Sequence, residues 1–106
     1  MSLDRLSMAI KMRAPISFEY AKTPGVRVGN PHALFVLRRH DGLETTKVDI
    51  EQTAGVSESG QPFPSWRRFD FDQLRVIAVH EDGAPFEVSS VYNPTASVYE
   101  LLIAKV

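Results

Sequence analysis

The segment from Trp66 to Asp72 combines arginines, aromatic residues and carboxylates in a pattern that could bind an anion. If it forms a strand, alternate side chains share a face, and Arg67 lies on the same face as Phe69 and Phe71. Two phenylalanines indicate a buried face, so Arg67 would stand on the apolar side of the sheet. A guanidinium group binds a phosphate or a carboxylate through paired hydrogen bonds, which the lysine ammonium does not. Arg67 is therefore the first candidate for an anion site.

Two interpretations of Arg67 remain open at this point. A charge on a buried face must be paired, because an unpaired buried charge is strongly destabilising. Arg67 could form an internal ion pair with an inward-facing carboxylate such as Asp49 or Glu51, or it could extend its charged end into water. It could instead lie at an open mouth of the fold and hold a ligand.

The ligand-binding interpretation includes the surroundings of Arg67. The residues expected to lie beside it in the site are Trp66, Arg68 and Gln52. The loop Ser57–Gln61 is expected to act as a lid, since long loops in compact domains often serve a function. Arg38 and Arg39 precede a hairpin turn and form a candidate basic rim if they lie near Arg67. Three aromatic side chains could stack on nucleobases, namely Tyr20, Trp66 and Tyr92.

Signals for catalysis and for metal binding are weak. The three histidines, at positions 32, 40 and 80, have no metal-ligand spacing. Asp70 and Asp72 could share a face and hold a divalent ion in a small hydrolase, but no third ligand accompanies them. The sequence contains no nucleophile elbow, P-loop or dinucleotide fingerprint. We therefore predict a non-enzymatic protein with no catalytic residues, no metal and no cofactor.

The elements that would position these residues are one helix and several short strands. Leu3, Leu6 and Ile10 recur at helical spacing and predict a helix from about residue 2 to 13, which Pro15 ends. From about residue 15 to 106, short strands alternate with turn signals. Proline cannot donate to a β-ladder, so 29–31 is expected to be a bend, a bulge or an edge, and 98–106 is expected to be the last strand. This pattern predicts a mainly β fold, a small antiparallel barrel with the helix at one end.

Composition is typical of one globular domain covering residues 1–106. Of the 106 residues, 43% are hydrophobic and 24% are charged, and cysteine is absent, which excludes disulfides and thiolate chemistry. The net charge of −1 is not that of a strong non-specific DNA-binding protein. Basic residues are nevertheless in excess before Val48 and acidic residues after it, so a local basic site is possible. No apolar run is long enough to span a membrane, and we predict a cytoplasmic protein without membrane contact.

The order of the motifs resembles the WYL domain, in particular its stand-alone, single-domain bacterial members. The matching segments, which cover nearly the whole chain, are Ile16–Tyr20, Pro31–Leu34, Ser59–Pro62, Trp66–Phe69 and Tyr92–Asn93. The resemblance implies an Sm-like or SH3-like β-barrel that senses a ligand, with nucleotides or nucleic acids as proposed ligands. It also implies that Arg67 is the arginine of the family's Arg-x-Phe motif, which helps to line the ligand site.

The chain departs from the family at two places. The Trp-Tyr-Leu triplet is missing from the matching strand, residues 45–50, and Glu51 stands where an aromatic residue is expected before Gln52. We expect a regulatory module that binds a small anionic ligand, a nucleotide or a short single-stranded nucleic acid through Arg67. The alternative is a module that interacts with a regulatory protein or with a second copy of itself through an exposed strand edge.

Overall fold

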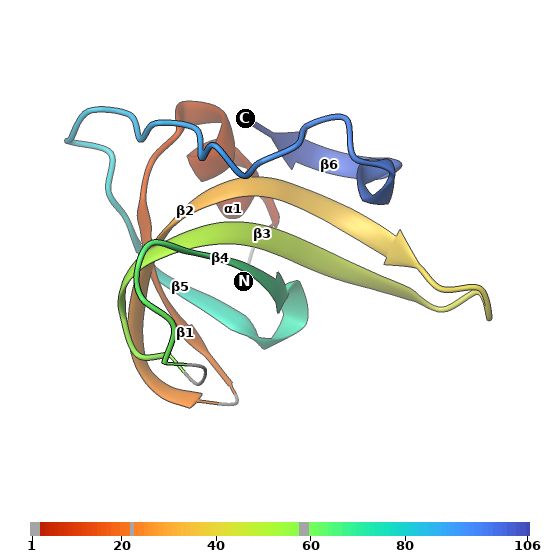
Figure 1. Cartoon of the computed structure of the whole chain (residues 1–106), viewed down its shortest axis with the longest axis horizontal. Coiled ribbons are helices and arrows are strands. Elements are labelled where there is room, and N and C mark those ends of the chain that lie inside the picture. The colour runs from red at the N-terminus through yellow and green to blue at the C-terminus, as the bar shows by residue number, and fades with distance from the viewer. Residues whose placement is uncertain (1–2, 22, 58–59) are drawn as a thin grey trace.

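The computed structural model describes residues 3–21, 23–57 and 60–106, which form one helix, six strands and two short 3-10 helices (Figure 1). In chain order these elements are α1 (Leu3–Met12), β1 (Ile16–Tyr20), β2 (Thr23–Arg38), β3 (Glu44–Gly55), β4 (Ser65–Asp70), η1 (Phe71–Gln73), β5 (Leu74–Val79), η2 (Ser97–Tyr99) and β6 (Leu101–Lys105). The mainly β class with an N-terminal helix is confirmed.

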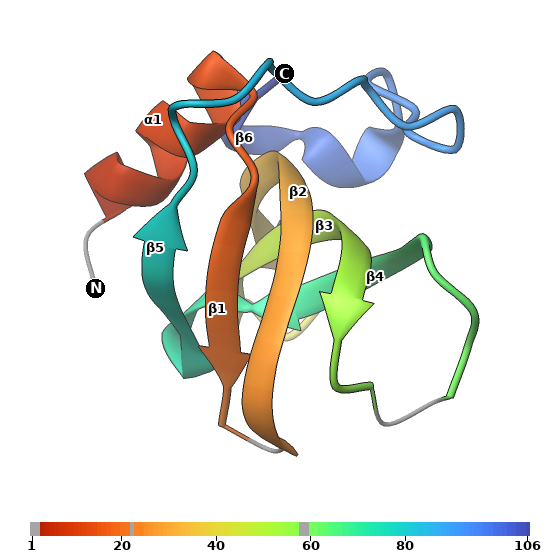
Figure 2. The same cartoon turned by 90° about the vertical axis from the view of Figure 1, so that its left-hand side faces the viewer.

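The strands make one antiparallel sheet built around the long strand β2. The order of paired strands is β4-β3-β2-β1-β5, and β6 pairs with the second half of β2. One edge of β2 is covered by β3, while the other edge is shared between β1 and β6. The pairing of β2 with β3 shifts register at Val28/Gly29 and again between Pro31 and Ala33. Such bulges bend and twist a strand, and the sheet curves strongly along β2 (Figure 2).

The sheet does not close into a barrel within the described residues. β4 and β5 lie at opposite ends of the strand order and are joined by η1, without a ladder between them. A side-chain contact spans the resulting seam, because the backbone N–H of Asp70 in β4 donates to the hydroxyl of Tyr20 in β1 at 2.9 Å. The antiparallel sheet is thus confirmed, while the closed barrel is not.

Hydrophobic residues are buried on both faces of the sheet. The larger cluster lies between α1 and one face and includes Leu6, Ile10, Phe18, Leu34, Ile50 and Phe69. The second cluster lies on the other face and consists of Ala33, Phe35, Tyr92 and Tyr99, with Trp66 packed against it. Since side chains alternate along a strand, Leu34 and Phe35 of β2 belong to different clusters. The chain between β5 and β6 supplies Tyr92 and Tyr99 and so covers the second face.

The helix and the irregularity at residues 29–31 agree with the sequence expectations, whereas the last strand begins later than expected. α1 lies within the predicted range and crosses one end of the strands (Figure 2), with Leu6, Ala9 and Ile10 buried against them. Pro31 lies at a register shift of β2, so the predicted irregularity at 29–31 is a bulge inside one continuous strand. The strand expected at 98–106 is confirmed in its second part, since β6 covers Leu101–Lys105, but its start is wrong because η2 occupies the first part.

Candidate functional site

Four cationic side chains from three strands surround one cleft beside the seam of the sheet. The cleft has a volume of about 250 Å³. The residues that line it are Tyr20 of β1, Arg27 of β2, Lys47 of β3, and Arg67, Arg68, Phe69 and Asp70 of β4. Asp70 is the one carboxylate among these lining residues. A hollow with this excess of positive charge and with aromatic rings in its wall has the chemistry of an anion site.

Arg27 lies at the inner end of the cleft and is fully buried. Its guanidinium carbon lies 5.3 Å from the ring centre of Phe69 and 5.8 Å from that of Tyr20, within the range of cation–π attraction. Its Nη1 donates to the side-chain oxygen of Gln52 at 3.3 Å. Gln52 in turn donates to the backbone oxygens of Ala54 and Val56, so Gln52 connects Arg27 to the end of β3.

The buried carboxylate of Asp49 orients the side chain of Arg68. Its Nε and Nη2 donate to the two oxygens of Asp49, at 2.7 and 3.0 Å. Asp49 is fully buried and also accepts a 2.6 Å hydrogen bond from the hydroxyl of Tyr99. The hydrogen bond to Asp49 raises the pKa of Arg68, and burial together with the bond to Asp49 raises the pKa of the Tyr99 phenol. Arg68 therefore remains charged and oriented, with Phe35 beneath its guanidinium group at 5.0 Å.

Lys47 and Asp70 form an ion pair within the cleft itself. The two residues stand opposite each other in the ladder between β3 and β4, and the Lys47 ammonium contacts a carboxylate oxygen of Asp70. Both side chains are a little more than one-fifth exposed. This pair differs from the one between Arg68 and Asp49 because both of its members reach solvent.

Arg67 lines the cleft, as the ligand-binding interpretation expects, and its Nη1 donates to the Ser57 hydroxyl at 3.2 Å. The predicted lid, Ser57–Gln61, includes residues 58 and 59, which lie outside the described residues. The contact with Ser57 nevertheless shows that the chain leaving β3 returns to the side of the cleft.

The internal ion pair considered for Arg67 is formed by its neighbour instead. Arg68, not Arg67, pairs with Asp49, because Arg68 and Asp49 are opposite each other in the ladder and share a face. Glu51 stands opposite Trp66 in the same ladder and accepts a hydrogen bond from Asn30 at 3.4 Å. Neither Asp49 nor Glu51 lines the cleft.

The structure does not bring all the predicted site residues together. Trp66 does not line the cleft but packs in the second cluster, where its ring lies 5.1 Å from that of His32 and 5.9 Å from that of Tyr92. Trp66 is therefore a packing residue and does not flank Arg67 in the cleft. Gln52 does not line the cleft either, and it contacts the site only through its hydrogen bond with Arg27.

The expected basic rim does not line the cleft. Arg38 stands opposite Glu44, which is about 10 Å along β3 from Lys47 and about 17 Å from Asp49, the residue opposite Arg68. The hairpin that carries Arg38 and Arg39 extends well beyond the end of β4 (Figure 1). Both arginines are also paired locally, Arg38 with Glu44 at 2.6 Å and Arg39 with Asp41 at 2.8 Å.

Two residues of the cleft were missed as site residues in the sequence. Arg27 stands between Val26 and Val28, and an apolar-in pattern would place the valines inside and the arginine outside. The structure has the opposite arrangement, with Arg27 buried and Val26 largely exposed. Gly25 and Gly29 flank Arg27 at alternate positions, and a β-carbon at either would collide with the side chain of Val56 or Ile50. Two glycines at alternate positions were the available signal of close packing beside Arg27. Nothing in the sequence except its charge indicated that Lys47 would belong to a site.

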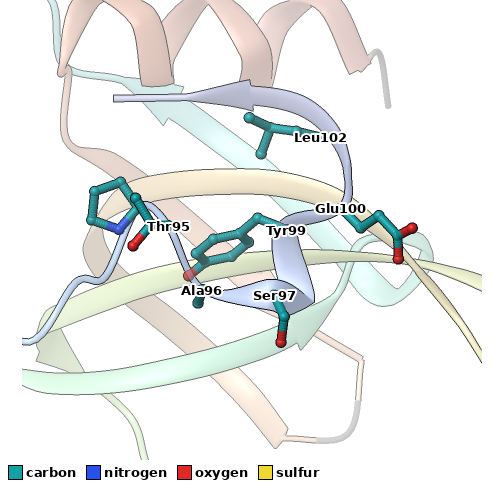
Figure 3. A pocket seen from close by; sticks show the side chains of 7 residues that line it. Thr95, Ala96, Ser97, Tyr99, Glu100 and Leu102 are labelled. Carbon is teal, nitrogen blue, oxygen red and sulfur yellow. The ribbon is translucent and has the colours of Figure 1, made fainter.

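Other parts of the molecule offer less chemistry. A larger cavity, of about 410 Å³, lies between η2 and β6, and Glu100 is its one charged lining residue (Figure 3). Ser17 and His80 are 2.7 Å apart but exposed, and neither lines the cleft or this cavity. The described residues contain no group of three or more potential metal ligands, and Asp70 is engaged by Lys47. Within the same part of the chain, no helix has the length and apolar character needed to cross a bilayer.

Comparisons of the chain with protein-family models, with curated proteins and with solved structures find no match. The resemblance to the WYL domain therefore rests on the order of the sequence motifs alone.

Proposed function

We propose that this protein is a non-enzymatic module that binds a small anionic ligand in the cleft beside the seam of the sheet. The observation that carries the proposal is the convergence of Arg27, Lys47, Arg67 and Arg68 on one cavity with a single lining carboxylate. Lys47 and Arg68 are already paired with Asp70 and Asp49, but cations that outnumber carboxylates in the lining of one cavity still make its potential positive. A positive potential attracts an anion to the cleft.

The size and the walls of the cleft favour a phosphate or carboxylate group carried by a small molecule. About 250 Å³ is slightly below the usual volume of pockets for drug-sized ligands. A nucleotide could place its phosphate in the cleft. Stacking of several bases of a longer single strand is less favoured, since Trp66 and Tyr92 pack against His32 and Tyr20 packs against Phe69.

The resemblance to the WYL domain supports the same proposal, because it places a ligand-lining arginine at Arg67. In that view the curved, open sheet would be a variant of the Sm-like or SH3-like barrel, and the ligand would regulate a partner protein.

The proposal is tested by thermal unfolding with inorganic phosphate, ribose 5-phosphate, mononucleotides and short DNA and RNA strands. A ligand that binds the folded state at about one hundred times its dissociation constant stabilises it by about 2.7 kcal/mol, a shift of several degrees. We expect Arg67→Gln to remove most of this shift, because it removes a charge from the cleft. The matched control is Arg75→Gln, which changes an exposed arginine of β5 that is paired with Glu19 outside the cleft.

Equal shifts for the wild type and Arg67→Gln would place the bound anion elsewhere and contradict the proposal. No shift with any ligand would leave self-association as the better function, for which β6 provides a specific observation. Among the described strands β6 pairs with β2 alone, and its residues Leu102 and Ile103 are each 39% exposed. An exposed apolar edge strand can pair with a second copy, which the molecular mass in solution would reveal.

A further inference from the structure

We propose that Arg68 is the anchor of the anion, and that the outer edge of its guanidinium group selects an oxyanion with two oxygens on one atom, a carboxylate or a phosphate. This inference rests on the proposed function, because it names the ligand group that the same cleft recognises. It concerns the hydrogen-bond donors of Arg68 and not a surplus of charge, since Asp49 already compensates the charge of Arg68.

Asp49 occupies only the inner side of the Arg68 guanidinium group. The two bonds to its carboxylate come from Nε and Nη2, at 2.7 and 3.0 Å. The Tyr99 hydroxyl lies on this inner side too, because it donates to the same Asp49 oxygen as Nη2 does. A guanidinium group has five N–H donors, so donors remain on the outer edge. Among the described residues, Nη1 of Arg68 has no hydrogen-bond acceptor.

The outer edge of Arg68 is the part that a solute can reach. The side chain of Arg68 is 40% exposed while that of Asp49 is fully buried, so the exposed atoms of Arg68 lie away from the ion pair. Arg68 also lines the cleft. Asp70, the carboxylate in the lining, contacts Lys47 and forms no ion pair with Arg68. The outer edge of Arg68 is therefore open to an anion from solution.

The guanidinium group is oriented before a ligand binds. Asp49 fixes two of its nitrogens, and the ring centre of Phe35 lies 5.0 Å from its central carbon. A planar group that is already fixed can form two parallel bonds to a carboxylate or a phosphate at a reduced entropic cost. A halide ion has no second oxygen for such a pair. Arg67 differs, because its Nη1 donates to the Ser57 hydroxyl, and we expect it to contribute mainly charge.

The experiment replaces chloride stepwise with acetate or with inorganic phosphate at constant ionic strength and follows binding by NMR chemical shifts. The proteins are the wild type, Arg68→Lys and the matched control Arg67→Lys. Both substitutions keep the positive charge, but a lysine ammonium cannot form the paired bonds. We expect Arg68→Lys to lower the preference for either oxyanion over chloride about fivefold, the effect of one hydrogen bond, and Arg67→Lys to lower it less than about twofold. The relative affinities of the wild type for acetate and phosphate identify which of the two groups the ligand carries.

A measurement on the wild type covers the case that Arg68→Lys does not fold. The Nε–H signal of Arg68 is assigned by through-bond correlation to its backbone. Acetate should shift this signal and saturate the shift at the same concentration as it does for the backbone amides of the cleft. The Nε–H signal of Arg75, which is exposed and paired with Glu19 outside the cleft, is the control and should not move.

The outcomes separate this inference from the proposed function. If the wild type binds acetate or phosphate, an unchanged preference in folded Arg68→Lys or an unmoved Arg68 signal would overturn the role of Arg68 and leave the proposed function intact. An equal loss of preference in Arg67→Lys would also overturn it, because neither arginine would then be the specific anchor. Absence of saturable shifts with both anions in the wild type would overturn the proposed function itself.

Discussion

Asp49 is a buried carboxylate that joins the cleft to the C-terminal part of the chain. It binds Arg68 of β4 on one side and the hydroxyl of Tyr99 in η2 on the other. The position of a cleft arginine therefore depends on a residue fifty positions away from Asp49 in the sequence. Because the carboxylate is fully buried, its partners are its only source of compensation for lost hydration among the described residues.

Asp49→Asn should lower the free energy of unfolding by about 2–3 kcal/mol, since charge-assisted hydrogen bonds to a buried group are lost. Tyr99→Phe removes one of these bonds and should cost about 1 kcal/mol. Urea denaturation of both variants measures these losses, with Asp41→Asn in the exposed hairpin turn as the control, which should change stability by less than about 0.5 kcal/mol. A loss for Asp49→Asn no larger than that of the control would show that the buried network is not stabilising.

His32 is a second buried polar residue, and its hydrogen bonds fix its protonation. Its Nδ1 lies 2.8 Å from the backbone oxygen of Asn30, to which it donates, and its Nε2 accepts the N–H of Ser89 at 2.9 Å. The ring must therefore be neutral, with its proton on Nδ1. Burial lowers the pKa of His32 and outweighs the opposing effects of the Asn30 hydrogen bond and of the nearby carboxylates Glu51 and Asp49.

The lowered pKa of His32 predicts a loss of stability in acid. The unfolded chain binds this proton near pH 6.5, whereas the folded protein binds it only at lower pH. The contribution of His32 to the free energy of unfolding is therefore fully present above about pH 6.5 and decreases as the pH falls below that value. The slope from this one group cannot exceed about 1.4 kcal/mol per pH unit. His32→Gln, which does not titrate, should show a flatter profile of unfolding free energy between pH 7.5 and 5 than the wild type. His40→Gln, in the exposed hairpin turn, should leave the profile unchanged, and an unchanged profile in His32→Gln would contradict the assignment.

At the scale of elements, the approach of β3 to β2 positions Arg27. Gly55 stands opposite Arg27 in the ladder, with a positive φ of 98°. A β-carbon at Gly55 would lie 2.2 Å from the backbone oxygen of Val26 and 2.6 Å from the α-carbon of Arg27. The end of β3 can therefore lie this close to the buried arginine because residue 55 has no side chain.

Gly55→Ala should lower the free energy of unfolding by at least about 3 kcal/mol, because backbone strain is added to a direct overlap with β2. Gly42→Ala is the matched control: Gly42 also has a positive φ, 89°, but a β-carbon there would meet no atom within 4 Å. The control should cost only about 1–2 kcal/mol, the strain alone. Urea denaturation gives the difference, and equal losses would show that the close approach at Gly55 does not matter.

The sequence predicted the elements better than it predicted the site. The helix, the irregularity at Pro31 and the presence of Arg67 in an open, basic place followed from local patterns. The sequence could not show that Arg68, rather than Arg67, forms the ion pair with Asp49. The register of the ladder between β3 and β4 determines which of the two arginines lies opposite Asp49. Arg27 was hidden for a similar reason, since the bulges of β2 determine which of its residues face inward.

At the scale of the whole molecule, basic residues from distant parts of the sequence lie together in the fold. The net charge is −1, yet the cleft keeps an excess of positive charge. Arg27 and Lys47 come from the basic first part of the sequence, and Arg67 and Arg68 from the acidic second part. The uneven charge of the sequence indicated that a local basic site was possible. The location of that site could not be predicted without the pairing of β4 with β3, because this pairing brings the two parts of the sequence together.

The seam between β4 and β5 has a further consequence for how the molecule opens. A complete ladder would join these strands through several backbone hydrogen bonds that break together. Among the described residues there is no such ladder, and Asp70 of β4 instead donates its N–H to the hydroxyl of Tyr20 in β1, the strand next to β5. Local opening is cheapest where few bonds must break at once. The amide of Asp70 should therefore exchange with deuterium faster than the amides inside the β2–β3 ladder. The cleft borders this edge, so a solute could enter and leave it through a local fluctuation while both hydrophobic clusters stay folded.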